Sequence, residues 1–195
     1  MTGMAELCLE FANTLSWRGS DPPSEALRDL DDLLAWCASA GAQDDAVIDR
    51  LGSWWRAQPA QGAEVFSEAI GLREVMYRVL SGEPASADLG RINDALRATP
   101  QRKRLERDGD GYTWQTEEAM PSTTTLLAPV LWSAGDLLTR PEVRRVRQCA
   151  NDRCRWLFLD DSKNASRRWC SMSMCGNRAK AHRHYLRTRH CLPSP

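Results

Sequence analysis

Four cysteines near the end of this 195-residue chain have the side-chain type and the spacing of metal ligands. Cys149, Cys154, Cys170 and Cys175 follow the pattern C-x4-C-x15-C-x4-C. Two close pairs of thiolates can reach the corners of a tetrahedron about 2.3 Å from a zinc ion. Because four thiolates close the coordination shell, the pattern predicts a structural Zn2+ site rather than a catalytic one.

Two other interpretations of these cysteines are a redox pair and a site in which histidine replaces one thiolate. A thioredoxin-like redox site needs C-x-x-C after a strand, and this spacing is absent. The three histidines, His182, His184 and His190, all follow Cys175 and could supply one ligand. Cys8 and Cys37 stand alone among apolar neighbours, which predicts buried, unreactive thiols.

A β-hairpin is expected to bring the two cysteine pairs together. Residues 155–159 are typical of a strand, residues 160–164 of a turn, and residues 166–169 of a chain returning to the second pair. A helix is predicted for residues 177–189, with Lys180, Arg183, His184 and Arg187 at the i, i+3, i+4 and i+7 positions of one face. Such a face could contact phosphate groups. The candidate nucleic-acid-binding residues are therefore Arg167, Arg168, Arg178, Lys180, Arg183, His184 and Arg187.

The net charge of zero hides a division along the chain. Residues 1–140 hold 13 Lys/Arg and 22 Asp/Glu, a net charge of −9, whereas residues 141–195 hold 13 and 4, a net charge of +9. This asymmetry is a recognised sign of a polyanion-binding tail, and a basic, solvated surface with no partner is the alternative that charge alone leaves open. No apolar run is long enough to span a membrane, and the N-terminus lacks a basic signal region, so we expect a cytoplasmic protein.

The N-terminal part has the periodicity of helices. They are predicted over residues 1–17, 25–40 with Ser24 as N-cap, 45–55, 63–80, a stretch after Ser86, and 126–138. The run DGDG predicts a hairpin before the last of these. The expected fold is mainly α with a β-hairpin (α+β): an α-rich domain over residues 1–138, then a zinc-ribbon or treble-clef-like module over 139–195. No feature of the sequence assigns an oligomeric state.

The C-terminal segment resembles a known family. Residues 149–154, 156–160, 167–170 and 174–180 carry the motifs of the CGNR zinc finger, which is named for the run Cys175-Gly176-Asn177-Arg178. Residues 1–138 resemble the ABATE domain through residues 9–14, 17–18, 33–36, 72–74 and 133–138. The resemblance implies a bacterial transcription regulator with an N-terminal sensing or ligand-binding domain.

Four residues of the N-terminal part could form a ligand site. Asn13, Trp17, Arg18 and Arg73 could line a pocket for a small anion, since a partly buried arginine offers a bidentate fork. The alternative is structural, with Arg73 paired to Glu10 or Glu74 and Trp17 at a core edge. The chain has no Ser-His-Asp set, phosphate loop or HExxH motif, so we do not expect an enzyme.

The leading hypothesis is a one-component transcription regulator that binds DNA through the zinc module. The first alternative is a protein-interaction adaptor whose zinc module docks on an acidic surface. The second is an RNA-binding accessory protein that stacks bases on Trp156, Trp169 or Tyr185.

Overall fold

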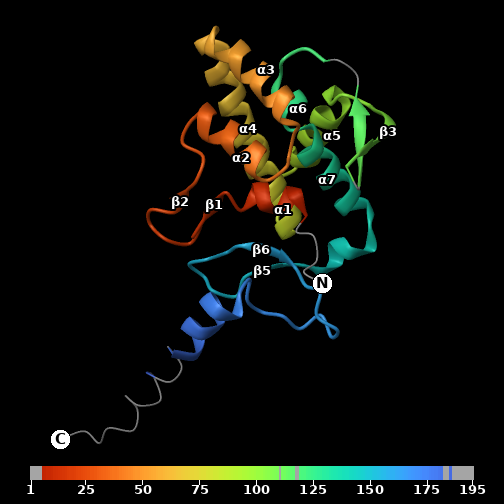
Figure 1. The fold of residues 1–195 in the computed structure, drawn as a ribbon. Coiled ribbons are helices and arrows are strands. Elements are labelled where there is room, and N and C mark those ends of the chain that lie inside the picture. Colours follow the sequence, from red (N-terminus) through yellow and green to blue (C-terminus); the bar gives the residue numbers. More distant parts are fainter. Residues whose placement is uncertain (1–5, 110, 117–118, 182–184, 186–195) are drawn as a thin grey trace, which may run out of the picture.

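Helices form most of the molecule, and the strands occur in three antiparallel pairs (Figure 1). The computed structural model describes residues 6–109, 111–116, 119–181 and 185. The α-helices are α1 (Leu7–Ala12), α2 (Leu30–Ser39), α3 (Asp45–Arg56), α4 (Pro59–Ser81), α5 (Asp88–Ala98), α6 (Thr123–Leu126) and α7 (Ala128–Thr139). The strand pairs are β1 (Leu15–Ser16) with β2 (Ser24–Glu25), β3 (Arg102–Asp108) with β4 (Gly111–Thr116), and β5 (Val146–Gln148) with β6 (Leu157–Leu159). A 3-10 turn, η1 (Pro141–Arg145), follows α7, and a π-turn, η2 (Met172–Gly176), contains Cys175.

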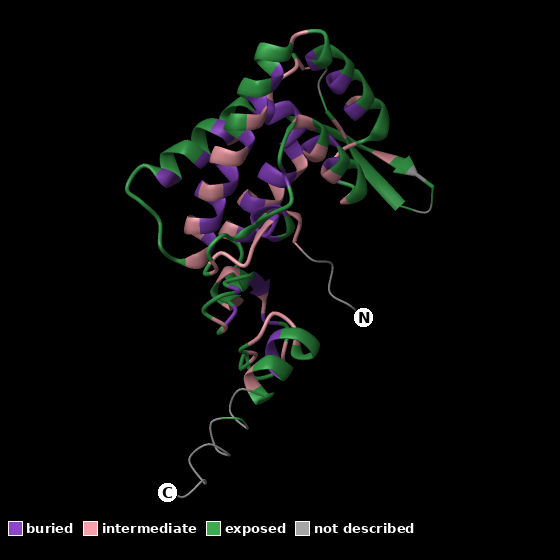
Figure 2. Ribbon diagram, turned by 90° about the vertical axis from the view of Figure 1, so that its left-hand side faces the viewer, coloured by how far each residue is buried: buried purple, intermediate pink, exposed green. Residues whose placement is uncertain are grey.

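The core lies between the helices, with α1 at its centre against α4 and α7 (Figure 1). Buried residues, purple in Figure 2, recur along the helices between exposed ones, because the apolar residues recur at helical spacing. Phe11 of α1, Met76 of α4 and Leu131 of α7 are fully buried. The same cluster includes Leu157 of β6, so the core continues from the helices into the cysteine-bearing segment.

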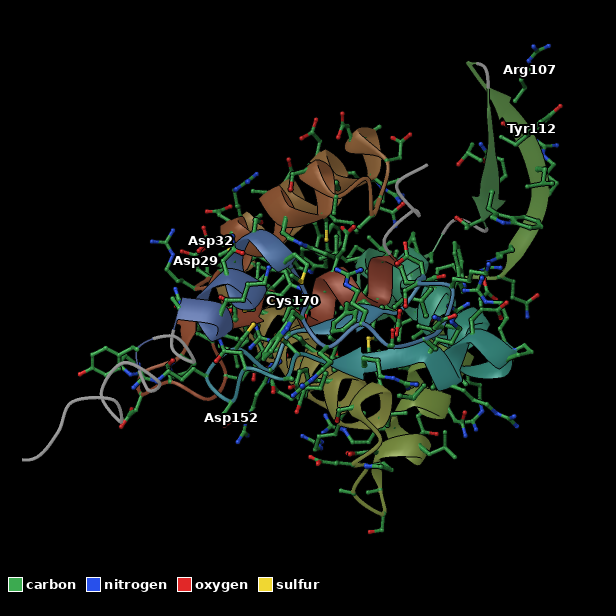
Figure 3. All side chains as sticks on the ribbon, turned by 90° about the horizontal axis from the view of Figure 1, so that it is seen from below. Asp29, Asp32, Arg107, Tyr112, Asp152 and Cys170 are labelled. Atoms are coloured by element: carbon green, nitrogen blue, oxygen red, sulfur yellow. The ribbon has the colours of Figure 1, made fainter. Side chains whose placement is uncertain are left out.

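The structure confirms the predicted α-rich body and the hairpin at DGDG. Asp44 caps α3 by accepting a hydrogen bond from the Ala46 N–H. Gly41 ends the second helix region with φ at +60°, a conformation that favours glycine. Hairpin β3–β4 stands away from the helical body, with Arg107 and Tyr112 toward its outer end (Figure 3). Among the described residues, none of the helices has the length and apolarity needed to cross a bilayer.

The first two helices are shorter than predicted. Helix α1 ends at Ala12, with Asn13 as its C-cap, and Leu15 instead lies in β1, opposite Glu25. That pairing takes Ser24 and Glu25 into β2, so Ser24 is not a helix cap. Helix α2 begins at Leu30, where the Asp29 side chain accepts from the Asp32 N–H. The Asp29 cap and the β1–β2 pairing thus set the ends of these two helices, and the apolar periodicity alone does not.

The hairpin near the cysteines also differs from the prediction. Strand β6 pairs with β5, which precedes the first cysteine pair, and not with residues 166–169. The hairpin therefore encloses the first pair of cysteines in its turn. Residues 166–169 run nearby, and the Ala150 N–H donates to the Arg168 carbonyl oxygen over 2.9 Å. This contact helps to hold the segment of the second cysteine pair beside the first.

Candidate functional site

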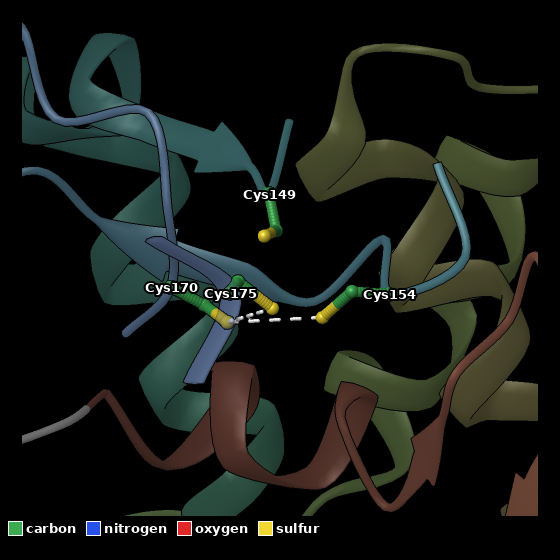
Figure 4. A group of neighbouring side chains, drawn as sticks. All are labelled: Cys149, Cys154, Cys170 and Cys175. Carbon is green, nitrogen blue, oxygen red and sulfur yellow. Dashed lines mark hydrogen bonds between the residues drawn. The ribbon is translucent and has the colours of Figure 1, made fainter. Parts of the chain in front are cut away.

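The four predicted cysteines form one cluster. Their Sγ atoms all lie within 4.8 Å of one another, and three of the four residues are buried. Figure 4 shows the thiols converging on a common point from the turn after β5, the segment before η2 and η2 itself. The Cys170 Sγ lies 3.7 Å from that of Cys154 and 3.8 Å from that of Cys175.

These distances fit a tetrahedral metal site. A tetrahedron with zinc–sulfur bonds of about 2.3 Å has edges of roughly 3.8 Å between sulfur atoms. The two short sulfur–sulfur distances match this edge. Soft thiolate donors favour zinc over magnesium or calcium, which prefer oxygen. The residues present therefore fit a structural zinc ion held by Cys149, Cys154, Cys170 and Cys175.

Burial and crowding disfavour the ionised form of two thiols. Burial, with a further contribution from the negative charge of Cys149, raises the pKa of Cys154 to about 11. Burial and the charges of Cys154 and Cys149 also raise the pKa of Cys170. A bound cation supplies the positive charge that allows all four groups to be thiolates.

Polar side chains fix the loops that carry the cysteines. Asp160 is fully buried and accepts from the Ser162 N–H at 3.0 Å and from the Arg167 N–H at 3.0 Å. The Asn151 amide donates to the Cys175 Sγ over 3.6 Å. Such outer contacts orient metal ligands. Sequence reasoning missed both roles, although an Asp and an Asn beside turns are their usual signal.

The predicted basic residues have different positions. Arg168, Arg178 and Lys180 are exposed next to the cysteine cluster. Arg167 is only partly exposed: it donates to the carbonyl oxygens of Trp169 and Cys170, and its guanidinium lies 4.6 Å from the Phe158 ring centroid. Because these contacts use its donors within the finger, Arg167 positions the cysteine loop rather than facing a partner.

The described part of the predicted basic helix is short. Residues 177–181 are helical and directly follow η2. Residue 185 is also helical. Arg183, His184 and Arg187 lie outside the described residues. Of the predicted nucleic-acid-binding residues, Arg168, Arg178 and Lys180 are therefore the ones that the structure both describes and shows to be exposed.

The finger is joined to the helical domain through Asn13. The Asn13 amide donates to the Leu157 carbonyl oxygen at 2.8 Å and accepts from the Leu157 N–H at 2.9 Å. Both residues are buried, with exposed fractions of 6% and 1%. Asn13 thus satisfies both backbone groups of one β6 residue, as a neighbouring strand would.

A second group of contacts surrounds Trp17, which packs against the cysteine cluster. The Arg178 guanidinium lies 4.6 Å from its ring centroid. Trp17 and Arg155 both have positive φ, of 53° and 52°, which is strained for residues with a side chain. The Tyr77 hydroxyl fixes this region by donating to the Arg155 carbonyl oxygen at 2.7 Å.

Gly19 permits the closest approach of the two parts of the chain. Its N–H donates to the Arg153 carbonyl oxygen over 3.1 Å. A Cβ atom at position 19 would lie 1.8 Å from the Asp152 carbonyl oxygen, so only glycine fits. The contact is with a segment far along the chain, so the local sequence around Gly19 does not indicate it.

The structure corrects the predicted anion pocket at Asn13, Trp17, Arg18 and Arg73. Arg73 is buried and forms a bidentate pair with Glu25, at 2.6 and 2.7 Å, and a third contact with Glu74 at 2.9 Å. Arg18 also binds Glu74, at 2.6 Å, and stacks 3.7 Å from the Tyr77 ring centroid. Although burial alone would raise it, the two arginines hold the pKa of Glu74 below its usual range.

The charges of this network are therefore matched by protein partners. Asn13 is likewise occupied by Leu157, and Trp17 by the finger. The predicted alternative, in which Arg73 pairs with Glu10 or Glu74, is correct for Glu74. The sequence did not indicate Glu25 as a partner of Arg73. A buried arginine with both fork positions occupied has no donor to offer a small anion.

Comparison with known sequence families agrees with this architecture. The ABATE family, described as "Putative stress-induced transcription regulator", matches residues 5–141. The CGNR zinc finger family matches residues 145–188, which include all four clustered cysteines. No curated protein sequence matches the chain. Since the first match covers well over half of the 195 residues, the chain belongs to the ABATE family, and it carries a CGNR zinc finger after the ABATE domain.

Proposed function

We propose that this protein is a transcription regulator that binds DNA through a zinc-anchored finger. The observation that carries the proposal is the position of three exposed basic residues, Arg168, Arg178 and Lys180, beside the four-cysteine cluster. Neutralising DNA phosphates with such side chains releases counterions and supplies sequence-independent affinity. The net charge of +9 over residues 141–195 supports the same reading.

In this proposal zinc has a structural role. The finger has few apolar residues of its own: its small cluster contains Phe158, three of the cysteines and partly buried neighbours. A module with so little core depends on metal for its stability. The four thiolates would hold the ion and thereby fix η2 and the basic residues that follow it.

The ABATE domain, residues 1–138 in our division, would act as the sensing part. Its connection to the finger is continuous, through Asn13, Trp17, Gly19 and Tyr77. A ligand or partner of the helical domain could change the orientation of the finger only if the protein has two finger orientations and the ligand binds one of them more tightly. The junction supplies direct contacts for such coupling.

Metal binding can be tested with cobalt in place of zinc. The purified protein should bind one Co2+ per chain and show the intense visible absorption of a tetrahedral thiolate site. Cys154→Ser should lose this spectrum, while Cys37→Ala, which removes a buried cysteine outside the cluster, should retain it. A weak octahedral spectrum in the native protein would contradict the site.

DNA binding can be tested by selection from genomic fragments, followed by sequencing of the retained pool. We expect enrichment of a common sequence by the zinc-loaded protein and none by Cys154→Ser. Retention of RNA but not duplex DNA would favour the RNA-binding alternative. Absence of any nucleic-acid retention would favour the adaptor, whose partner would be an acidic protein surface.

A further inference from the structure

A cavity of about 680 Å3 lies at the junction between the ABATE domain and the finger. One wall comes from α1, the β1–β2 region and α2, and the other from β6 and its flanking residues. The lining residues that bear on its chemistry are Glu10, Trp36, Trp156, Phe158, Asp161 and Arg167. Cavities between domains are frequent ligand sites.

Aromatic rings line this cavity on both sides. Trp36 belongs to the helical wall, where the Phe11 ring lies 5.1 Å away and supports it. Trp156 and Phe158 belong to the finger wall. Trp156 keeps 41% of its surface exposed, so part of its indole is accessible at the junction. Aromatic faces bind cations through their quadrupole as well as apolar groups.

The charged groups at the cavity favour a cation over an anion. Its one arginine, Arg167, already donates to the carbonyl oxygens of Trp169 and Cys170 and contacts Asp161 at 3.5 Å. Glu10 is exposed, and within the part of the chain that the structure describes its carboxylate has no hydrogen-bond or ion-pair partner. An incoming anion would therefore meet an unpaired carboxylate and an arginine whose donors are in use.

We infer that this cavity binds a small organic cation with apolar substituents, of the quaternary or alkylated ammonium class. The aromatic residues Trp36 and Trp156 would contact the apolar substituents, and Glu10 would balance the charge. A hydrated metal ion would suit this site poorly because most of the surface that lines it is apolar. The ligand is thus opposite in charge to the small anion that the sequence suggested.

Binding at this place would couple directly to the finger. Asn13 lines the cavity and holds the backbone of Leu157, which also lines it. A ligand that binds more tightly at one spacing of the two walls would shift the finger toward the corresponding orientation. By linkage, bound DNA would change the protein's affinity for the ligand by the same factor as the ligand changes its affinity for DNA. This coupling rests on the proposed DNA-binding function, whereas ligand binding itself does not.

The test is an NMR titration of the zinc-loaded protein without DNA. Choline and benzyltrimethylammonium serve as probes, and the indole N–H resonances of Trp36 and Trp156, assigned with Trp36→Phe and Trp156→Phe, report binding. The uncharged isostere of choline, 3,3-dimethylbutan-1-ol, and the anion 3,3-dimethylbutanoate are the comparison ligands. Glu10→Gln removes the unpaired carboxylate, and Glu64→Gln on α4 is its exposed control.

We expect saturable shifts of both indoles with the cations and binding weaker by about tenfold for the uncharged isostere, as cation–π attraction predicts. Glu10→Gln should weaken cation binding several-fold, and Glu64→Gln should leave it unchanged. Equal binding of the isostere, stronger binding of the anion, or no indole shift with either cation would overturn the inference. A later change in DNA affinity on adding the cation would then test the coupling, and its absence would reject the coupling alone.

Discussion

The substitution Asn13→Ala tests the junction between the two parts of the chain. It removes the amide that satisfies both backbone groups of Leu157, at 2.8 and 2.9 Å, in a place where Leu157 is 1% exposed. Each buried backbone group left unpaired costs about 1–3 kcal/mol, so we expect a loss of about 3 kcal/mol in the free energy of unfolding. Alanine also leaves space that the surrounding helices fill only in part.

Urea unfolding of the zinc-loaded protein, followed by circular dichroism, measures this loss. Asn93→Ala is the matched control, because Asn93 is exposed on α5 and should change stability by less than about 0.5 kcal/mol. Asn13→Asp keeps the acceptor for the Leu157 N–H but loses the donor to its carbonyl, so it should also destabilise. If Asn13→Ala and Asn93→Ala gave the same midpoint and slope, the junction described above would not contribute to folding.

Three further predictions follow from single contacts. Gly19→Ala should displace the finger loop and lower the free energy of unfolding by roughly 1–3 kcal/mol. Gly90→Ala, in an open helical position, should stabilise the protein slightly, and the midpoints of urea unfolding measure both effects. The side-chain hydrogen bond from Arg78 lowers the pKa of Asp88 to about 2. The stability of the protein should therefore fall as the pH drops from about 4 to about 2, and thermal melts at several pH values should show that Asp88→Asn lacks this part of the acid dependence. Burial raises the pKa of Cys37 to about 12, so mass spectrometry should find it unlabelled by iodoacetamide at pH 8 in the folded protein and labelled in urea.

The cysteine cluster could be predicted from sequence because its spacing is local and its ligands share one chemistry. Four thiols in two close pairs leave few other arrangements for a chain of this composition. The helices α3, α4 and α7 could likewise be foreseen, since their apolar residues recur at helical spacing and Asp44 marks a start. Even so, α4 begins at Pro59, four residues before the expected start, because proline is favoured in the first turn.

The junction could not be predicted, since its partners are far apart in sequence and one of them is backbone. The sequence predicts that Asn13 lines an anion pocket, yet its partner is the main chain of a residue 144 positions away. The main partner of Arg73 is Glu25, which the sequence predicts to begin a helix but which lies in β2. A one-dimensional pattern shows that a polar group needs a partner but not which distant atom supplies it.

The most direct test of the central claim is the salt dependence of binding to a random-sequence DNA duplex, measured by fluorescence anisotropy with zinc-loaded protein. Affinity should fall steeply as salt rises, and each phosphate contact should contribute about 0.9 to the slope of log K against log salt. Arg168→Ala should reduce this slope by about one, while Arg97→Ala, an exposed arginine of the helical domain, should leave it unchanged. Binding that is absent at low salt, or a slope that neither variant changes, would contradict a DNA-binding finger.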